Sequence, residues 1–470
     1  MSATTVTVTP PGVPDPYVLR KEDALEPPTT FRGRFRYLGP GMLLSAAVVG
    51  SGELITTTAL GAQAGFVLLW LVIISAAVKV WVQLELARWS ILSGKTALEG
   101  YAQVGPKIGR ISWINVLWIG MDIAKMLQRG GIIGGAVTAC SLLLPIVDKP
   151  LSFPSLLIWT VIILIVTVGV VYLNRYSLIE RIAVIAIAFT TLATVALAVG
   201  LPFTEFSYGP VDLATGLAFA IPVGTIGIAV AMFGLTGVGA DEMTTYTYWC
   251  LEKGYARWIG PDDGSEARAK RAEGWLKVLK LDVLLSWVVC TACTLAFYII
   301  GAAVLHPQGL VPKGMEMIST LSKVWSSVLG DWGGVFFLIA AAVILAKTFL
   351  ASCASVPRLW ANTLGLLGVI DWRNPEQRQR TIRALVLILP PIWAVSFLFI
   401  QSPLLMVQIG GIASGIFLVA VVFATWHLRR EVPERFRGGM LNTGMLVLSS
   451  LAITALGIYT ITQVFGVKIG

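Results

Sequence analysis

The chain has 470 residues, of which 56% are hydrophobic and 13% are charged, and its formal net charge is +9. Its mean hydropathy is +0.79. Soluble domains carry about 25% charged residues, so the composition excludes a soluble globular protein and predicts a chain that lies mostly in lipid. The sequence contains no P-loop, nucleophile-elbow or zinc motif. We therefore expect neither an enzyme nor a cofactor.

Apolar segments long enough to span a bilayer recur about eleven times along the chain. This pattern predicts an all-α polytopic membrane protein. Residues 1–37, which precede the first span, begin with a polar and Pro-rich stretch, and we expect them to form a disordered tail. The predicted spans cover residues 38–64, 66–92, 111–145, 154–173, 178–201, 216–251, 281–305, 333–356, 382–400, 403–427 and 443–466.

Basic residues concentrate in alternate loops. One set of loops begins with Arg32, Arg34 and Arg36, whereas the loop at 201–215 has no Lys or Arg. By the positive-inside rule this distribution predicts a protein of the cell (inner) membrane with a cytoplasmic N-terminus. An odd number of spans then places the C-terminus on the outer side of that membrane. The net positive charge follows from this topology. We therefore expect the lipid bilayer as a partner, and no nucleic acid.

The first and sixth spans each contain a polar break. Residues 49–58 read VGSGELITTT and residues 238–247 read VGADEMTTYT. Gly50 and Gly52 make unwinding inexpensive, and Glu53 places a carboxylate at hydrocarbon depth, where it needs a partner, a cavity or an ion. The two stretches align over Val49, Gly50, Glu53, Thr56 and Thr58 with Val238, Gly239, Glu242, Thr245 and Thr247. Broken helices at corresponding places in two halves indicate the central site of a transporter.

The second break carries two adjacent acids, Asp241 and Glu242. On a regular helix their side chains would diverge by about 100°, whereas an unwound break can present both to one cavity. Their charges repel in a low dielectric unless a cation or a lysine lies between them. Cys290 and Cys293 lie on an apolar segment without a second cysteine pair, which favours packing over a metal role.

Five further charged residues at span depth are candidates for a proton path or for counter-ions. Asp122 and Lys125 share a helix face, as do Lys125 and Arg129. These three residues have two interpretations. They form an internal ion pair that allows a polar helix to lie inside the bundle, or they line a proton path or the substrate vestibule. Lys79 either reaches the membrane interface or pairs inside the bundle. Lys347 lies within an apolar run and is a candidate counter-ion.

The sequence contains the short motifs Leu38-Gly39-Pro40, Gly61-Ala62-Gln63, Leu69-Trp70 and Ser93-Gly94-Lys95. With the first helix break between them, these motifs resemble the natural resistance-associated macrophage protein (Nramp) family of divalent metal transporters. The resemblance extends from Leu38 to the last span, and it implies a fold of LeuT type with two inverted five-helix repeats. These would cover residues 38–201 and 216–427, with an additional helix at 443–466 and unwound first and sixth helices around the ion.

The metal-site motifs of that family are altered in this sequence. Gly50-Ser51-Gly52-Glu53 stands in place of Asp-Pro-Gly-Asn, Asp241-Glu242-Met243 in place of Met-Pro-His, and Asp122-x-x-Lys125 in place of Asp-x-x-Glu. The resemblance therefore implies a metal site of Glu53, Asp241 and Glu242, with carbonyls from Gly50 and Gly239. Such oxygen ligands suit hard ions such as Mg²⁺ or Mn²⁺, which would be the substrate. Because the family's aspartate and histidine are absent, we expect a passive or weakly proton-coupled carrier.

Two other functions remain open. The buried cations Lys79, Lys125, Arg129 and Lys347 repel a divalent ion, so the same fold is also compatible with an organic substrate of amino-acid or polyamine type. The altered metal motifs are also compatible with a membrane receptor or scaffold. The sequence does not indicate an oligomeric state.

Overall fold

The computed structural model describes residues 15–147, 149–172, 176–222 and 224–464, so the first 14 residues of the predicted tail lie outside it. Secondary structure in the described part is almost entirely helical, and the strands β1 (Lys107–Ile108) and β2 (Ile111–Ser112) form an antiparallel hairpin. In chain order the helical elements are η1 (Lys21–Asp23), α1 (Phe31–Phe35), α2 (Pro40–Val48), η2 (Ser51–Thr57), α3 (Thr58–Ala64), α4 (Leu69–Ser93), α5 (Ala97–Tyr101), α6 (Trp113–Leu143), α7 (Phe153–Tyr172), α8 (Tyr176–Gly200), η3 (Leu201–Phe203), α9 (Pro210–Thr215), α10 (Ile226–Leu235), α11 (Ala240–Lys253), α12 (Tyr255–Ile259), α13 (Glu266–Ile300), η4 (Gly301–Leu305), η5 (Gly314–Glu316), α14 (Met317–Leu329), α15 (Asp331–Leu367), α16 (Pro375–Ile400), α17 (Pro403–Arg429), η6 (Glu434–Phe436) and α18 (Gly439–Val464).

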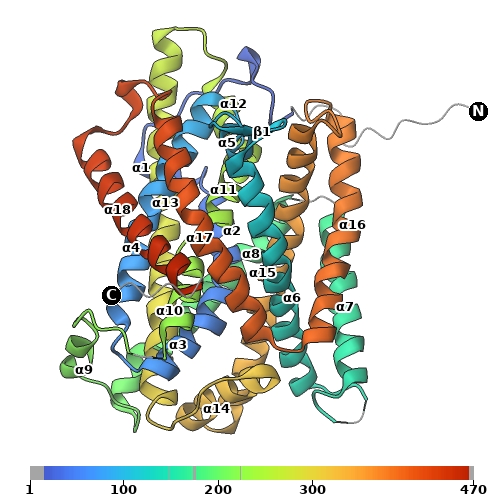
Figure 1. Ribbon diagram of the computed structural model, residues 1–470, viewed down its shortest axis with the longest axis vertical. Coiled ribbons are helices and arrows are strands. Elements are labelled where there is room, and N and C mark those ends of the chain that lie inside the picture. The colour runs from blue at the N-terminus through green and yellow to red at the C-terminus, as the bar shows by residue number, and fades with distance from the viewer. Residues whose placement is uncertain (1–14, 148, 173–175, 223, 465–470) are drawn as a thin grey trace, which may run out of the picture.

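The long helices form one bundle and run roughly along the long axis of the molecule (Figure 1). Within it, α17 packs along α6, α10 and α18, and α6 also packs against α15 and α16. The short elements α5, α12 and β1 gather at one end of the bundle, whereas α9 and α14 lie at the other end (Figure 1). The central helices therefore lie between two ends that carry different short elements.

Nine helices or broken helices in the described part are long and apolar enough to cross a membrane. The two remaining predicted spans are also helical. Residues 111–145 correspond to α6, which carries three charged residues. Residues 178–201 correspond to α8, whose last part forms a shorter apolar helix, Thr191–Phe203, together with η3. The predicted all-α membrane fold is thus confirmed, and nine of its about eleven predicted spans are found as candidate membrane spans in the described part of the chain.

Both predicted helix breaks are present. The first membrane helix consists of α2 and α3, which are joined by the π-type turn η2. The sixth consists of α10 and α11, with residues 236–239 between them. This sixth helix begins at Ile226 rather than at residue 216, because residues 217–220 are exposed and Phe219 takes a positive φ of 55°.

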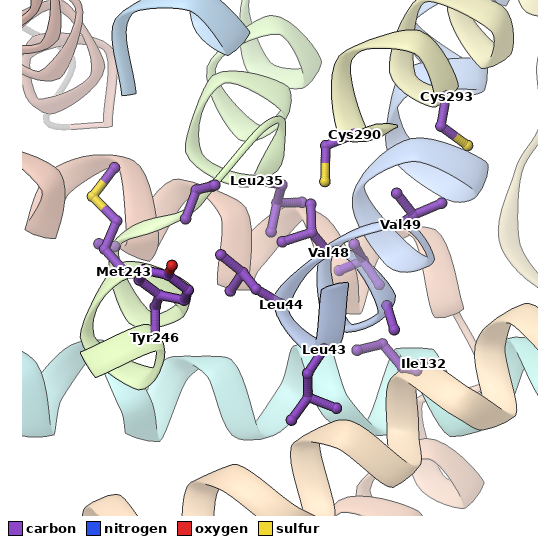
Figure 2. Close-up of a cluster of buried hydrophobic side chains, with 14 of the residues drawn as sticks. Leu43, Leu44, Val48, Val49, Ile132, Leu235, Met243, Tyr246, Cys290 and Cys293 are labelled. Carbon is purple, nitrogen blue, oxygen red and sulfur yellow. The ribbon is translucent and has the colours of Figure 1, made fainter. Parts of the chain in front are cut away.

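Apolar side chains of the two broken helices share one buried core. Leu44 and Val48 of α2 gather there with Leu235, the last residue of α10, and Met243 of α11 (Figure 2). Cys290 and Cys293 of α13 belong to the same buried cluster, and both are free thiols. Their position agrees with the packing role expected for the pair. The two breaks are therefore held against each other by close-packed side chains.

The segment 15–37 is ordered, which corrects the prediction of a disordered tail for these residues. Tyr17 is buried, and its hydroxyl donates to Oε1 of Glu252 near the end of α11 at 2.8 Å. Asp15 pairs with Arg378 of α16, also at 2.8 Å. Such contacts are not visible in the local composition, because the partners lie more than 200 residues away along the chain.

Candidate functional site

The first break lies directly after α2. The backbone of Val49 leaves the helical path with a ψ of 87°. A Cβ atom on Gly50 would collide with Oγ1 of Thr348, so the close approach of α15 requires glycine at this position. The hydroxyls of Thr57 and Thr58 stabilise the following turn by donating to carbonyls five residues earlier, at 2.9 and 3.3 Å. These two threonines therefore provide partners for backbone carbonyls that the break leaves without a regular helical hydrogen bond.

Lys347 of α15 binds the carbonyls at this break. Its Nζ donates to the carbonyl oxygens of Ala46 and Val49, each at 2.6 Å. Ala46 lies in the last turn of α2, where carbonyls have no partner within the helix. Thr348 also donates to the Ala46 carbonyl, at 3.3 Å. A positive charge is favourable here because the helix dipole places negative partial charge at the C-terminal end of α2.

Lys79 of α4 acts in the same way at the second break. Between α10 and α11 the chain turns at Gly237, whose φ of 74° favours glycine. The Nζ of Lys79 donates to the carbonyl of Phe233 and, at 2.7 Å, to that of Thr236. Lys79 is fully buried, so it pairs inside the bundle and does not reach the membrane interface.

The two acids of the second break face one lysine. Asp241 and Glu242 lie in the first turn of α11, where the helix dipole favours negative charge. The Nζ of Lys125 on α6 pairs with Asp241 and lies 3.4 Å from Oε1 of Glu242. The acid side chains are 13% and 16% exposed, whereas that of Lys125 is 2% exposed. The ammonium group therefore offsets the repulsion between two neighbouring carboxylates.

These three charged groups line a small cavity between α2, α6, α11 and α15. Its space for water-sized groups is about 30 Å³, which corresponds to roughly two water molecules. Its remaining polar lining consists of Gln128, Arg129, Thr245, Thr348, Ser352 and Ser355. Apart from the charged groups, these side chains offer amide and hydroxyl oxygens to a bound cation.

A buried ion pair on α6 stands behind the cavity. Asp122 pairs with Arg129, and its second oxygen accepts a hydrogen bond of 2.6 Å from Nε1 of Trp360. The Arg129 guanidinium lies 5.2 Å from the centroid of the Trp393 ring. The sequence favoured an internal ion pair, and the structure contains one, but Asp122 binds Arg129 two turns away because Lys125 is engaged by the acids of α11.

Glu53 lies apart from the acid pair. It is fully buried in η2, and its Oε1 lies 3.2 Å from Oγ1 of Thr294 on α13. Its charge acts on Lys79 and on Lys347, the lysines of the two breaks. Within the described residues, no group of three or more His, Cys, Asp or Glu side chains is placed to hold a metal ion. The metal site of three acids therefore stays a prediction, although two of those acids, Asp241 and Glu242, are neighbours on α11.

The predicted glycines lie at the breaks. Gly52 packs against Leu235, where a Cβ atom would be 3.4 Å from the Leu235 Cβ, and Gly239 directly precedes α11. Sequence reasoning missed Thr294 and Trp360 as partners of the buried acids. Neither residue carries a local signal, because threonine and tryptophan are ordinary constituents of apolar membrane helices.

The fold and the site together define a class of protein. Two broken helices that meet beside a charged cavity are typical of membrane transporters of LeuT type. A mutant of the Eremococcus coleocola manganese transporter has the same fold, with a TM-score of 0.60 at 16% identity, over 96% of this chain and 100% of that one. MhsT in complex with L-phenylalanine has a TM-score of 0.53 at 16% identity, over 93% and 100%. The chain therefore has the LeuT-type transporter fold.

The family follows from the sequence comparison. The model of the natural resistance-associated macrophage protein-like (Nramp) family matches residues 41–463, and the chain belongs to this family. A relative from Caldanaerobacter subterraneus subsp. tengcongensis, named divalent metal cation transporter MntH, is 25% identical over 362 residues, which is 77% of each chain. The resemblance inferred from the short motifs is thus confirmed.

Proposed function

We propose that this protein carries a divalent metal cation across the membrane and binds it at Asp241 and Glu242. The observation that carries the proposal is the placement of these neighbouring carboxylates at a cavity between the two broken helices. The relative named as a divalent metal cation transporter and the manganese transporter of the same fold support a metal as the substrate class.

The cavity lining favours a hard ion. Its oxygen donors are the two carboxylates, the Gln128 amide and hydroxyls such as that of Thr245, and none of the residues that line it is Met, Cys or His. Oxygen ligands suit Mg²⁺ and Mn²⁺, whereas sulfur ligands favour softer metals. Mg²⁺ keeps several of its waters and needs few direct protein ligands. We therefore expect Mg²⁺ or Mn²⁺ to be preferred.

Metal binding in this arrangement requires Lys125 to release the acids. Two unit charges 4 Å apart interact by about 4 kcal/mol at an effective dielectric constant of 20, and a divalent ion doubles that repulsion. The ammonium group and the metal therefore compete for the same carboxylates. Arg129 is held back by Asp122, so Lys125 is the cation that has to move.

Glu53 has a different part in this proposal. In the present conformation it is one of several charges that act on Lys79 and Lys347, and it accepts a hydrogen bond from Thr294, so binding the metal directly would require the turn η2 to rearrange. Calorimetric titration of Glu53→Gln with Mn²⁺ separates the two roles. A loss of binding in a folded variant would assign Glu53 to the metal, and unchanged affinity would leave it as a counter-charge.

The direct test of transport is ion flux into proteoliposomes. We expect uptake of Mg²⁺ or Mn²⁺ above that of empty vesicles. The double variant Asp241→Asn/Glu242→Gln should lose about tenfold or more of this rate, because it removes both charged ligands. Glu205→Gln removes an exposed acid far from the cavity and serves as the matched control. Absence of Mg²⁺, Mn²⁺ and Ca²⁺ flux with folded wild-type protein would refute the proposal.

A second candidate is a small organic solute that carries both charges. The cavity holds Lys125 and Arg129 beside Asp241 and Glu242, so a carboxylate and an amine of one substrate could each find a partner. The fold shared with MhsT, which binds L-phenylalanine, supports this reading. Uptake of labelled amino acids and polyamines, unaffected by added Mn²⁺, would favour it. Metal flux without any solute uptake would exclude it.

A further inference from the structure

The two helix breaks bind lysine in the same geometry. Lys347 contacts the carbonyls of Ala46 and Val49, and Lys79 contacts those of Phe233 and Thr236. In each case the two carbonyls are three residues apart, and they belong to the C-terminal end of the first half-helix, α2 or α10. Both lysines are at most 4% exposed, so neither ammonium group is in contact with bulk water.

A hydroxyl oxygen adjoins each pair of carbonyls. Oγ1 of Thr348 lies 3.3 Å from the Ala46 carbonyl, and Oγ of Ser75 lies 3.5 Å from that of Thr236. Each hydroxyl comes from the same helix as the lysine of that break. Each break therefore presents two carbonyl oxygens to one ammonium group, with a hydroxyl oxygen beside those carbonyls, and neutral oxygens of this kind also suit a small monovalent cation.

Negative potential surrounds each lysine at its break. The C-terminal end of a helix carries roughly half a negative charge, and each ammonium group binds the carbonyls at such an end, of α2 or of α10. Removal of either lysine would therefore leave unpaired carbonyl oxygens and negative potential at that break.

We infer that the two breaks are cation sites for a monovalent ion such as Na⁺, each occupied by a lysine of this chain. Unwound carbonyls and half-helix C-termini coordinate such ions in transporters with broken helices. Here the ammonium groups take that place, so the wild-type protein needs no Na⁺ to complete its breaks. These sites are distinct from the acid pair, which lies at the N-terminal end of α11.

The experiment is to remove each lysine and supply the ion. We expect the purified Lys347→Ala and Lys79→Ala variants to gain thermal stability with NaCl relative to choline chloride at equal ionic strength. Mass action predicts a rise in unfolding midpoint of roughly 1 °C or more for each tenfold increase in Na⁺ above its dissociation constant. The wild-type protein and the control Lys323→Ala, which loses an exposed lysine of α14, should respond equally to both salts.

Each outcome decides the inference. An ion site at a break is supported if its alanine variant gains thermal stability with Na⁺ but not with choline. It is also supported if that variant can be purified in a folded state only when Na⁺ is present. Equal midpoints in both salts overturn it, as does failure to recover both variants in either salt, because the ion then does not replace the lysine. A Na⁺-specific gain in the wild-type protein also overturns it. Lys347→Met, which fills the space without a charge, should show no Na⁺ response.

Discussion

Single buried cations in this protein differ in the groups that hold them. Lys79 and Lys347 bind backbone carbonyls at the helix breaks, whereas Lys125 and Arg129 bind carboxylates on α11 and α6. A carbonyl at the end of a helix cannot move without unwinding that helix, so the first two lysines are structurally fixed. A carboxylate side chain can exchange one cation for another. Because the proposed function assigns Asp241 and Glu242 to the substrate, Lys125, which pairs with both, is the cation that the substrate would have to displace.

Replacing Lys125 with methionine should strengthen metal binding. The Lys125→Met variant removes the ammonium group that competes for Asp241 and Glu242, and we expect the dissociation constant for Mn²⁺ to fall by about tenfold or more. Isothermal titration calorimetry measures this change, and Lys323→Met on the exposed face of α14 is the control. Unchanged or weaker binding by folded Lys125→Met would show that the metal and Lys125 do not share the acid pair.

At the scale of elements, the segment 15–37 connects helices that are distant in sequence. Tyr17 binds Glu252 at the end of α11, and Glu252 also pairs with Arg358 of α15 at 2.7 Å. The carbonyl of Tyr17 accepts a hydrogen bond from Arg373, which precedes α16. Burial raises the pKa of the Tyr17 hydroxyl well above its ordinary value, so this group remains a donor at neutral and mildly alkaline pH.

Loss of the Tyr17 hydroxyl should loosen this segment. A hydrogen bond to a charged group contributes about 1.5–3 kcal/mol, so we expect Tyr17→Phe to raise the rate of proteolytic cleavage within residues 15–37 by local opening. Limited proteolysis followed by mass spectrometry gives the rate. Tyr37→Phe, a half-buried tyrosine of the same segment, is the control. Equal cleavage of both variants and wild type would show that the hydroxyl does not hold the segment.

At the scale of the whole molecule, the basic loops predict which end faces the cytoplasm. Ser327 belongs to α14, which lies at one end of the bundle (Figure 1). Glu434 belongs to η6, whose Arg435 pairs with Glu266 at the start of α13, close in sequence to α12, which lies at the other end. Single cysteines can be introduced at Ser327 and at Glu434. In a background where Cys140 is serine, a membrane-impermeant maleimide should label Ser327→Cys in intact cells and Glu434→Cys only after lysis. The reverse pattern would show that the protein has the opposite orientation.

Local sequence was sufficient to predict the helices and the fact that two of them are broken. A run of apolar residues has to form a helix in lipid, because backbone groups find no partner there other than each other. Glycines beside a carboxylate interrupt such a run for an equally local reason. The first break lies within residues 49–58, whereas the second lies at 236–239, and Asp241 and Glu242 belong to the regular first turn of α11 rather than to an unwound segment. The need for a cation beside Asp241 and Glu242 was also local, since adjacent charges repel.

Only the tertiary structure decided which partner each charged group takes. Lys125 binds acids 116 and 117 residues away, Lys347 binds carbonyls about 300 residues away, and Glu53 lies by Thr294 rather than by the acid pair. Spacing along one helix predicted an ion pair between Asp122 and Lys125. A buried charge instead pairs with the closest available opposite charge, whichever helix carries it. Sequence determines secondary structure through local rules, whereas these pairings depend on how the helices pack in three dimensions.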